Sequence, residues 1–374
     1  MVLDQVAGDP RRGHPVALFG SAAGKLEARM WRDGRGAGAG YAALLTVAPA
    51  LLGLLPRRLP SPWLITATAL GTWTVLGSRS LSAEAEAVAA HLGRGDLPAA
   101  REQLTHLVGR RTDTLDEAEI ARATVESVAE NTSDAVVAPL LWGALAGLPG
   151  LLAYRAVNTL DAMVGHHSPR YENFGWASAR ADDVANYLPA RLTAGLTAVV
   201  APLAGGSGRA ALAVARADGR RHPSPNAGVA EAAFAGALGV RLGGRNDYGS
   251  HIEDRPVLGG DGRSPQATDI TRATRLSRAI TAAAAVACAA IALARGRCGL
   301  RDRPSSYPRV SPLTYPAKSI KLRTRTRKTT GSPNDFGLLH PANRSLRRGK
   351  AGQRAGRLAR TQSPQTEGFS GAIL

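Results

Sequence analysis

Residues 126–154 read ESVAENTSDAVVAPLLWGALAGLPGLLAY, and this stretch decides the predicted fold class. Glu126, Glu130 and Asp134 follow one another at intervals of four residues, and residues 135–154 then contain no Asp, Glu, Lys or Arg. A helix of about 20 apolar residues is long enough to cross the hydrocarbon core of a bilayer. The stretch therefore predicts a helix that starts with a face of carboxylates and continues as a membrane segment.

Four further stretches lack charged residues over 16–21 positions: residues 36–56, 59–77, 192–208 and 279–294. The first two are long enough to span a bilayer, and the last two are marginal because they are short and rich in Ala and Gly. Buried helices of a soluble all-α protein are the alternative, but five such stretches in one chain favour membrane segments. We predict an all-α fold, namely a polytopic integral membrane protein of the cell (inner) membrane with polar helical loops.

The net charge of +18 is concentrated at the end of the chain. Residues 295–374 hold 18 Lys and Arg against 3 Asp and Glu, whereas residues 1–294 hold 29 against 26. This tail is poor in aliphatic residues and has no periodicity, which predicts disorder. We therefore expect a membrane domain in residues 1–294 and a basic low-complexity tail in residues 295–374. Charge alone would attract anionic lipid or RNA, so the tail does not indicate a specific nucleic-acid partner.

The polar connections also contain helical patterns. Residues 16–30 predict a short amphipathic helix, residues 56–58 a basic tip between two hydrophobic segments, and residues 82–107 an exterior helical section. Residues 227–240 are weakly apolar but contain Glu231, which predicts a half-buried or interfacial helix. Two cysteines in the whole chain are too few for a disulfide framework or a zinc site.

The carboxylates of residues 126–134 are the sharpest local feature. At about 100° per residue, positions 126, 130 and 134 share one face of a helix. Like charges at this spacing destabilise an isolated helix, so the face needs a counter-charge. A divalent cation with phosphate oxygens can supply it, because Mg²⁺ uses one or two carboxylates together with water and substrate phosphates. A solvated face paired with Arg122 is the alternative, and the spacing alone does not separate the two.

Three further polar clusters lie beside the hydrophobic segments. Their members are Arg155, Asn158 and Asp161 after the third stretch, Arg180, Asp182 and Asp183 before the fourth, and Arg220, His222 and Asn226 after it. Polar groups near a membrane are costly and tend to mark function. Carboxylates interleaved with arginines suit a metal together with phosphate or carboxylate groups. Ordinary ion pairs at helix ends are the alternative for each cluster, but their shared position favours one polar site.

Together these segments resemble the adenosylcobinamide-phosphate synthase family, the CobD/CbiB-type membrane proteins of cobalamin biosynthesis. The resemblance rests on the carboxylate stretch at 126–134, AVNTLDAMVG at 156–165, ASARADD at 177–183, PARLT at 189–193, HPSPN at 222–226 and EAAFAGALGVRLGG at 231–244. Similar motifs are GDP at 8–10 and HPV at 14–16. The resemblance covers residues 4–294. The basic tail departs from the family pattern, in which chains usually end soon after the last hydrophobic helix.

The resemblance implies an ATP-dependent enzyme with Mg²⁺ as cofactor. It would join adenosylcobyric acid to (R)-1-amino-2-propanol, or to its O-phosphate, through an amide bond. The corrinoid, the aminopropanol and the lipid bilayer are then the expected partners. The expected catalytic residues are Glu126, Glu130, Asn131 and His222; the expected substrate-binding residues are Arg155, Asn158, Arg180, Arg220 and Asn226; the expected metal ligands are Glu130, Asp134, Asp161, Asp182 and Asp183.

Two other functions fit parts of the pattern. A Mg²⁺-dependent prenyltransferase-like membrane enzyme would also use helix carboxylates, but it should carry two separated Asp-rich repeats, and only one cluster here approaches that. A non-enzymatic transporter or scaffold would not need so many carboxylates and amides beside the membrane. The sequence leaves the topology open because Arg and Lys occur in every connecting region, and it leaves the oligomeric state open.

Overall fold

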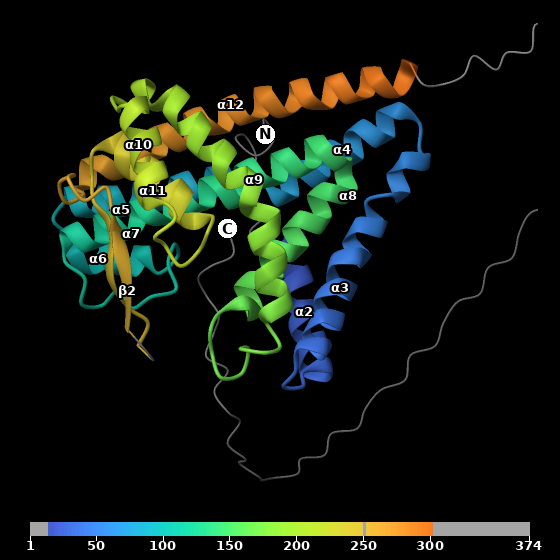
Figure 1. Cartoon of the computed structure of the whole chain (residues 1–374), viewed down its shortest axis with the longest axis horizontal. Coiled ribbons are helices and arrows are strands. Elements are labelled where there is room, and N and C mark those ends of the chain that lie inside the picture. Colours follow the sequence, from blue (N-terminus) through green and yellow to red (C-terminus); the bar gives the residue numbers. More distant parts are fainter. Residues whose placement is uncertain (1–13, 250–251, 302–374) are drawn as a thin grey trace, which may run out of the picture. The chain divides into compact units, whose positions relative to one another are not determined.

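The computed structural model describes residues 14–249 and 252–301, and most of these residues are helical (Figure 1). The helices are α2 (Pro15–Met30), α3 (Arg35–Leu52), α4 (Ser61–Val75), α5 (Ser78–Gly93), α6 (Leu97–Leu104), α7 (Glu117–Thr132), α8 (Ala138–Leu160), α9 (Trp176–Val200), α10 (Gly208–Asp218), α11 (Ala227–Leu238) and α12 (Ala267–Arg301). The predicted helical fold class is confirmed, and the predicted amphipathic helix is α2. The prediction of a disordered tail concerns residues that lie mostly outside the described ranges.

The carboxylate stretch and the hydrophobic segment after it form one connected helical segment, as predicted. α7 begins with a reciprocal cap in which Glu119 N–H donates to Asp116 Oδ1 (2.8 Å) and Asp116 N–H donates to Glu119 Oε2 (2.9 Å). This arrangement satisfies amide groups that the first turn of a helix leaves unpaired. A π-helical turn, η2 (Ser133–Val137), then connects α7 to α8.

α8 bends back sharply at Gly147, a feature that was not predicted from the sequence. Gly147 has φ 69° and ψ −158°, a conformation that strains any residue with a side chain. The Tyr154 hydroxyl donates to the Asp134 carbonyl at 2.8 Å, although 20 residues of straight helix would separate these positions by about 30 Å. The bend therefore divides the segment into two arms, and the second arm returns to the side of Asp134.

The tip between α3 and α4 packs on this bend. A Cβ atom on Gly53 would lie 2.7 Å from the backbone of Pro149, so only glycine fits there without movement. The predicted basic tip forms the short turn η1 (Leu55–Arg58), and Arg57 donates to the Ala146 carbonyl at 3.3 Å. These contacts hold the end of the first arm in place.

Four described segments are long and apolar enough to cross a membrane: Arg35–Arg58, Glu117–Gly165, Trp176–Ala204 and Ala267–Arg295. They contain three of the five uncharged stretches in full and residues 192–204 of a fourth. The fifth stretch, at 59–77, forms α4, whose 15 residues are fewer than a bilayer span needs. The two stretches predicted as marginal gain length because α9 and α12 begin well before them.

Large apolar side chains are exposed on the helices of three of these segments and on α4. Leu52 of α3, Ile65 of α4, Val199 of α9 and Val286 of α12 are between 61% and 75% exposed. The described parts of α5, α6, α7 and α8 expose no large apolar side chain. A contiguous apolar surface is unfavourable in water, whereas the hydrocarbon of a bilayer solvates it. The exposed side chains of α3, α4, α9 and α12 are therefore compatible with a lipid surrounding.

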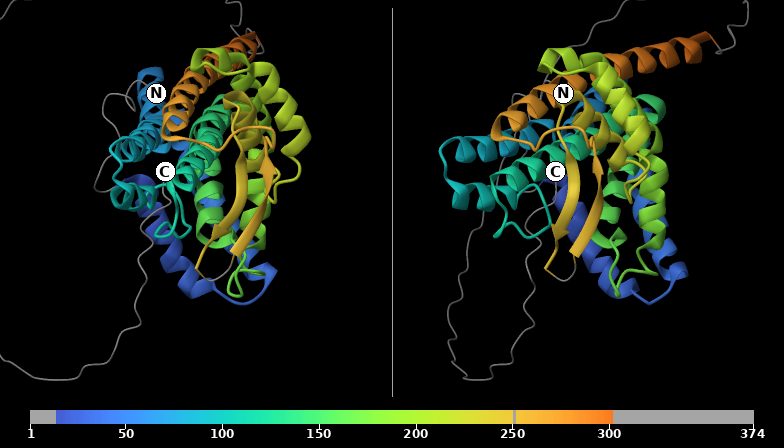
Figure 2. Two further views of the ribbon diagram at one scale, coloured as in Figure 1. Left: turned by 90° about the vertical axis from the view of Figure 1, so that its left-hand side faces the viewer. Right: turned by 60° about the vertical axis from the view of Figure 1, so that its left-hand side comes forward.

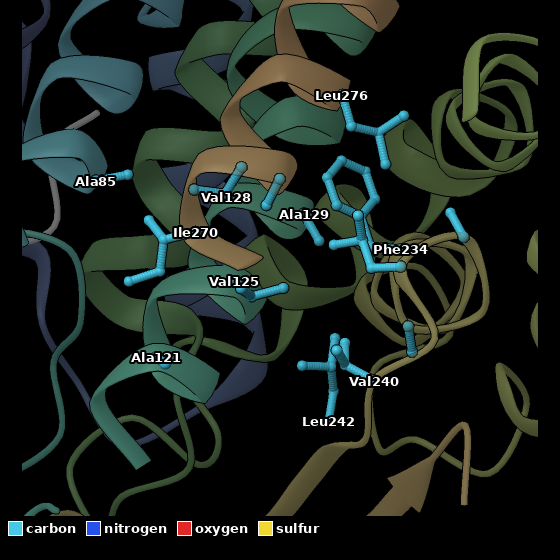
Figure 3. Packing of buried hydrophobic residues seen from close by; sticks show 14 of the residues in the cluster. Ala85, Ala121, Val125, Val128, Ala129, Phe234, Val240, Leu242, Ile270 and Leu276 are labelled. Atoms are coloured by element: carbon cyan, nitrogen blue, oxygen red, sulfur yellow. The ribbon is translucent and has the colours of Figure 1, made fainter. Parts of the chain in front are cut away.

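The largest buried core joins α7, α11 and α12 (Figure 3). Val125 of α7, Phe234 of α11 and Leu276 of α12 are fully buried in it. Every residue of α11 is buried, so the predicted half-buried helix at 227–240 is wrong in its degree of exposure. Its many Ala and Gly residues allow α7, α9 and α10 to approach closely, and Glu231 is enclosed instead of facing solvent.

The strands β1 (Leu242–Asp247) and β2 (Ile252–Leu258) form an antiparallel hairpin that contacts α7 and α11 (Figure 2). Leu242 pairs with Leu258 and Gly244 pairs with Arg255, so the register shifts by one residue between Leu242 and Gly244. No strand was predicted here, because these strands carry Gly, Asp and Arg without the alternation of apolar residues that marks a strand. The hairpin is the one departure from an all-helical fold in the described residues.

Candidate functional site

A cavity of about 680 Å³ lies among α7, the second arm of α8, α11 and the hairpin, with α2 at one side. Cavities of this size hold nucleotide-sized ligands. Its acidic residues are Glu27, Glu126, Glu130, Asp134, Asp161 and Glu231, and its basic residues are His106, Arg110, Arg155 and Arg255. Seven predicted site residues line it: Glu126, Glu130, Asn131, Asp134, Arg155, Asn158 and Asp161.

The bend at Gly147 assembles the acidic part of this cavity. Glu130 and Asp134 belong to the first arm, and Asp161 follows the end of the second. Asp134 and Asp161 both lie in π-helical turns, the second being η3 (Asp161–Gly165). Such turns are rare and occur frequently at functional sites. The fold thus brings together carboxylates that a straight helix would hold about 40 Å apart.

Glu126 has partners on both carboxylate oxygens. Oε2 accepts a hydrogen bond from Arg110 (2.9 Å), and Oε1 accepts from Gly243 N–H (2.7 Å) and from Arg122 (3.3 Å). A buried carboxylate is stable only with such compensation. Glu126 therefore connects α7 to the hairpin and holds Arg110 at the cavity, while its catalytic role stays a prediction.

Several charged or polar cavity residues were not predicted as site residues, among them Glu27, His106, Arg110, Glu231, Tyr248 and Arg255. Arg255 donates to the Tyr248 hydroxyl (3.0 Å) and to Glu253 (3.2 Å). Burial raises the pKa of Tyr248, so its hydroxyl keeps the proton. Only weak signals for these residues are present in the sequence. Glu231 interrupts an apolar stretch, and the Gly243–Gly244 pair indicates a backbone conformation that favours glycine.

The predicted residues on α9 lie behind the cavity wall. Asp182 accepts hydrogen bonds from Asn186 (2.9 Å) and from Asn158 (3.5 Å), so it orients a side chain that lines the cavity. Asp183 pairs with the exposed Arg180 at 3.3 Å. None of Asp182, Asp183 and Arg180 is among the residues that line the cavity.

The predicted cluster before α11 is also outside the cavity. Asn226 accepts a hydrogen bond from Arg191 (2.7 Å) and donates to the Asp183 carbonyl (2.8 Å), which ties α9 to the start of α11. Arg220 is exposed. His222 is buried, and its Nε2 lies 3.9 Å from Oε2 of Glu231. Of this cluster, His222 therefore lies next to a residue that lines the cavity, namely Glu231.

The cavity provides oxygen ligands suited to Mg²⁺. Within the described residues, no three His, Cys, Asp or Glu side chains converge closely enough to hold a metal ion by themselves. Mg²⁺ does not require this, because it completes its shell with water and substrate phosphates. Glu130, Asp134 and Asp161 line one cavity and fit an ion shared with a phosphate ligand. The metal assignment stays a prediction for these three residues and for Asp182 and Asp183.

Comparison with known proteins gives the family. The family described as CobD/Cbib protein matches residues 1–277. The chain belongs to the CobD/CbiB family. Three relatives named cobalamin biosynthesis protein CobD come from Mycobacterium tuberculosis (55% identical over 286 residues, 76% of this chain and 91% of the relative), Geobacter metallireducens (48% over 267 residues, 69% and 84%) and Rhodobacter capsulatus (44% over 276 residues, 72% and 86%). No solved structure matches the chain.

The CobD/CbiB match contains the whole cavity. Its lining residues fall between Ala17 and Arg255, inside the matched residues 1–277. The match ends within α12 and does not include the basic tail. The predicted family is thus confirmed for the part of the chain that forms the candidate site.

Proposed function

We propose that this protein is an ATP-dependent ligase of cobalamin biosynthesis in the cell membrane. It would join the carboxyl group of adenosylcobyric acid to the amino group of (R)-1-amino-2-propanol or its O-phosphate, giving adenosylcobinamide or its phosphate. Membership of the CobD/CbiB family and the names of the CobD relatives support the pathway. The four apolar segments support the membrane location.

The observation that carries the proposal is the meeting of several carboxylates and three guanidinium groups in one cavity. Amide ligation with ATP brings together phosphate groups, a carboxylate and an ammonium group. Arg110, Arg155 and Arg255 offer planar donors that suit phosphate and carboxylate oxygens. Glu130 and Asp134 offer negative charge for a cation. A cavity with both kinds of group can hold all the reacting parts at once, which lowers the entropic part of the barrier.

Mg²⁺, when bound, would shield the charge of the ATP phosphates. The chain's own residues bind and orient the substrates. Arg155 is placed to bind anionic oxygen, while Asn131 and Asn158 offer amide groups for the carboxamides of the corrinoid or for phosphate. A corrinoid with its adenosyl ligand is larger than a cavity of about 680 Å³. We therefore expect the reacting carboxyl arm to enter while the macrocycle stays at the mouth.

Reconstitution tests this proposal. The purified protein in detergent is incubated with adenosylcobyric acid, MgATP and either amine, and the products are identified by mass spectrometry. We expect an amide product that requires both ATP and the amine, and complementation of a bacterial strain blocked at cobinamide formation. A folded protein that forms no amide product with either amine and does not complement the strain would contradict the proposal.

A further inference from the structure

Glu231 is a buried carboxylate that lines the cavity without a hydrogen-bond partner. The residue is 1% exposed, and neither Oε1 nor Oε2 has a hydrogen-bond partner among the described residues. Burying an unpaired carboxylate is strongly unfavourable, so such a group either takes up a proton or is completed by a group of opposite charge. The missing partner must enter through the cavity, because protein atoms enclose the other sides of α11.

His222 supports Glu231 from behind. Its ring lies against α11 because Gly228, one turn before Glu231, has no side chain: a Cβ there would lie 2.2 Å from the Cβ of His222. Ser224 N–H donates to Nδ1 at 3.1 Å. The Ser224 carbonyl also lies 3.3 Å from Nδ1. In the tautomer in which Nδ1 accepts from Ser224 N–H, the ring proton is on Nε2, which lies 3.9 Å from Glu231 and has no hydrogen-bond partner among the described residues. A small shift would let His222 donate to Glu231.

The surroundings of Glu231 favour its accepting a proton. Burial raises its pKa, and the negative charges of Glu126 and Glu130 raise it further, against the opposing effect of Arg255 and Arg110. Burial, together with Arg255, lowers the pKa of His222, so the ring stays neutral. A carboxylate whose pKa lies closer to neutrality is a better proton acceptor for a cationic substrate than an ordinary glutamate.

A primary ammonium group would complete this site. Two free carboxylate oxygens match two of its three N–H donors. The guanidinium of Arg255 could also have paired with Glu231, but it donates to Tyr248 and Glu253 instead. In the reaction proposed above, the amine is the substrate that carries an ammonium group at neutral pH, and it must lose a proton before it can attack.

We propose that Glu231 receives the ammonium group of the amine substrate and accepts its first proton, and that His222 is a positioning residue that holds the carboxylate. The inference rests on the proposed ligase function. One N–H proton passes to Glu231, which gives the neutral amine and a carboxylic acid. The amine lone pair then forms the C–N bond to the carboxyl carbon activated as an acyl phosphate, and the C–O bond breaks as phosphate leaves. The nitrogen loses its second surplus proton to that phosphate.

Kinetics of Glu231→Gln test the inference, because the substitution keeps size and hydrogen bonding while removing the charge. We expect kcat/KM for the amine to fall about 100-fold or more, while the KM for the corrinoid and the Mg²⁺ requirement stay unchanged. Wild-type kcat/KM should rise with pH through the raised pKa of Glu231, and the variant should lose this rise. Glu86→Gln is the matched control, since Glu86 pairs with Arg278 at the surface and lies outside the cavity.

Two variants separate positioning from folding. His222→Gln keeps a donor near Glu231 and should retain much more activity than His222→Ala, with both proteins unfolding at similar temperatures. Equal loss in both, with the KM for the corrinoid also raised, would indicate a structural role for His222 and overturn its assignment. A Glu231→Gln protein that needs more Mg²⁺ but keeps its KM for the amine would identify Glu231 as a metal ligand.

A binding measurement decides the inference even if the wild-type protein makes no product. Calorimetry with (R)-1-amino-2-propanol O-phosphate should show binding to the wild-type protein and at least about 10-fold weaker binding to Glu231→Gln, the loss expected when a charged partner is removed. Propane-1,2-diol 2-phosphate, which lacks the nitrogen, should bind both proteins equally. Equal binding of the amine to both proteins would overturn the inference whatever the outcome for the ligase reaction.

Discussion

Glu130 lies on α7 one helical turn from both Glu126 and Asp134, and it lines the cavity. We expect Glu130→Gln to abolish ligation while leaving membrane insertion unchanged, because it removes the charge that a cation requires and keeps the size of the side chain. Removing a charged group that stabilises the transition state typically lowers turnover about 100-fold or more. The measurement is product formation over a Mg²⁺ titration.

Glu117→Gln is the control for this experiment, since Glu117 lies exposed in the first turn of the same helix. It should leave turnover and the Mg²⁺ dependence unchanged. Full activity of Glu130→Gln at limiting Mg²⁺ would remove Glu130 from the metal site.

Glu126 leads to a different expectation because its carboxylate is already paired. Glu126→Ala should lower the free energy of unfolding by about 3–5 kcal/mol, the cost of leaving the buried Arg110 without its partner, and should expose the hairpin to protease. Glu253→Ala, which removes a partly exposed partner of Arg255, should cost at most about 1 kcal/mol. Thermal unfolding and limited proteolysis in detergent measure both effects. Unchanged unfolding with lost activity would favour a catalytic role for Glu126.

The predicted residues that line the cavity lie on helices, in polar clusters that interrupt apolar sequence. Such clusters stand out in the sequence, and these residues could therefore be predicted. Arg110 and Arg255 belong to a loop and a strand, where charged residues are ordinary and give no signal. Asp182 and Asn226 carry the same kind of sequence signal as Asp161, yet Asp182 bonds to Asn158 of α8 and Asn226 bonds to the backbone of α9. Sequence proximity to a membrane segment cannot distinguish a side chain that faces a cavity from one that joins two helices.

At the scale of elements, the bend in α8 determines whether the site exists. Gly147→Val should destabilise the protein and abolish activity, because a side chain at φ 69° costs about 1–2 kcal/mol and a β-branched residue costs more. Relief of this strain would straighten the helix and separate Asp134 from Asp161. Thermal unfolding and product formation are the measurements.

Gly195→Ala in α9 is the matched control. A Cβ atom there meets no other atom within 4 Å, and alanine favours helix, so this variant should be as active and at least as stable as the wild-type protein. Wild-type activity and stability of Gly147→Val would show that the cavity does not depend on the bend.

Helix positions were predictable because charged residues are absent from the apolar stretches and capping residues such as Asp116 begin the polar helices. The bend was not, although GLPG at 147–150 contains two glycines and a proline. Both residue types also occur within membrane helices, where neighbouring helices satisfy the freed backbone groups. The hairpin was missed because its stability comes from Arg122 and Glu126 on α7, which lie far away in the sequence.

At the scale of the whole molecule, the four segments that are long and apolar enough to cross a membrane and the exposed apolar side chains of α3, α4, α9 and α12 favour a lipid surrounding. We expect the protein to sediment with membranes and to need detergent for extraction. High-salt washing should not release it, because salt weakens ionic attachment and not apolar burial. Recovery in the soluble fraction after a high-salt lysis would contradict the membrane architecture.

The basic tail allows a last prediction, which depends on where α12 ends. The tail holds most of the net charge but lies outside the family match, and its composition cannot bury enough apolar surface to offset an ordering cost of about 1–2 kcal/mol per residue. A chain that ends at Arg301 keeps all of α12. We expect it to insert and catalyse like the full chain. It should bind less anionic lipid or RNA than the full chain, and this difference in binding between the two chains should disappear as salt is raised.

A chain that ends at Ala294 is the informative comparison, because it also loses Arg295. The Arg295 guanidinium donates to the Ala144 carbonyl at 2.9 Å, near the bend of α8. Hydrogen bonds from charged groups contribute about 1.5–3 kcal/mol, so the shorter chain should unfold at a lower temperature than the chain that ends at Arg301. Equal stability of the two would show that Arg295 does not hold the bend. Loss of activity in a chain that ends at Arg301 and still inserts normally would assign a working part to residues 302–374.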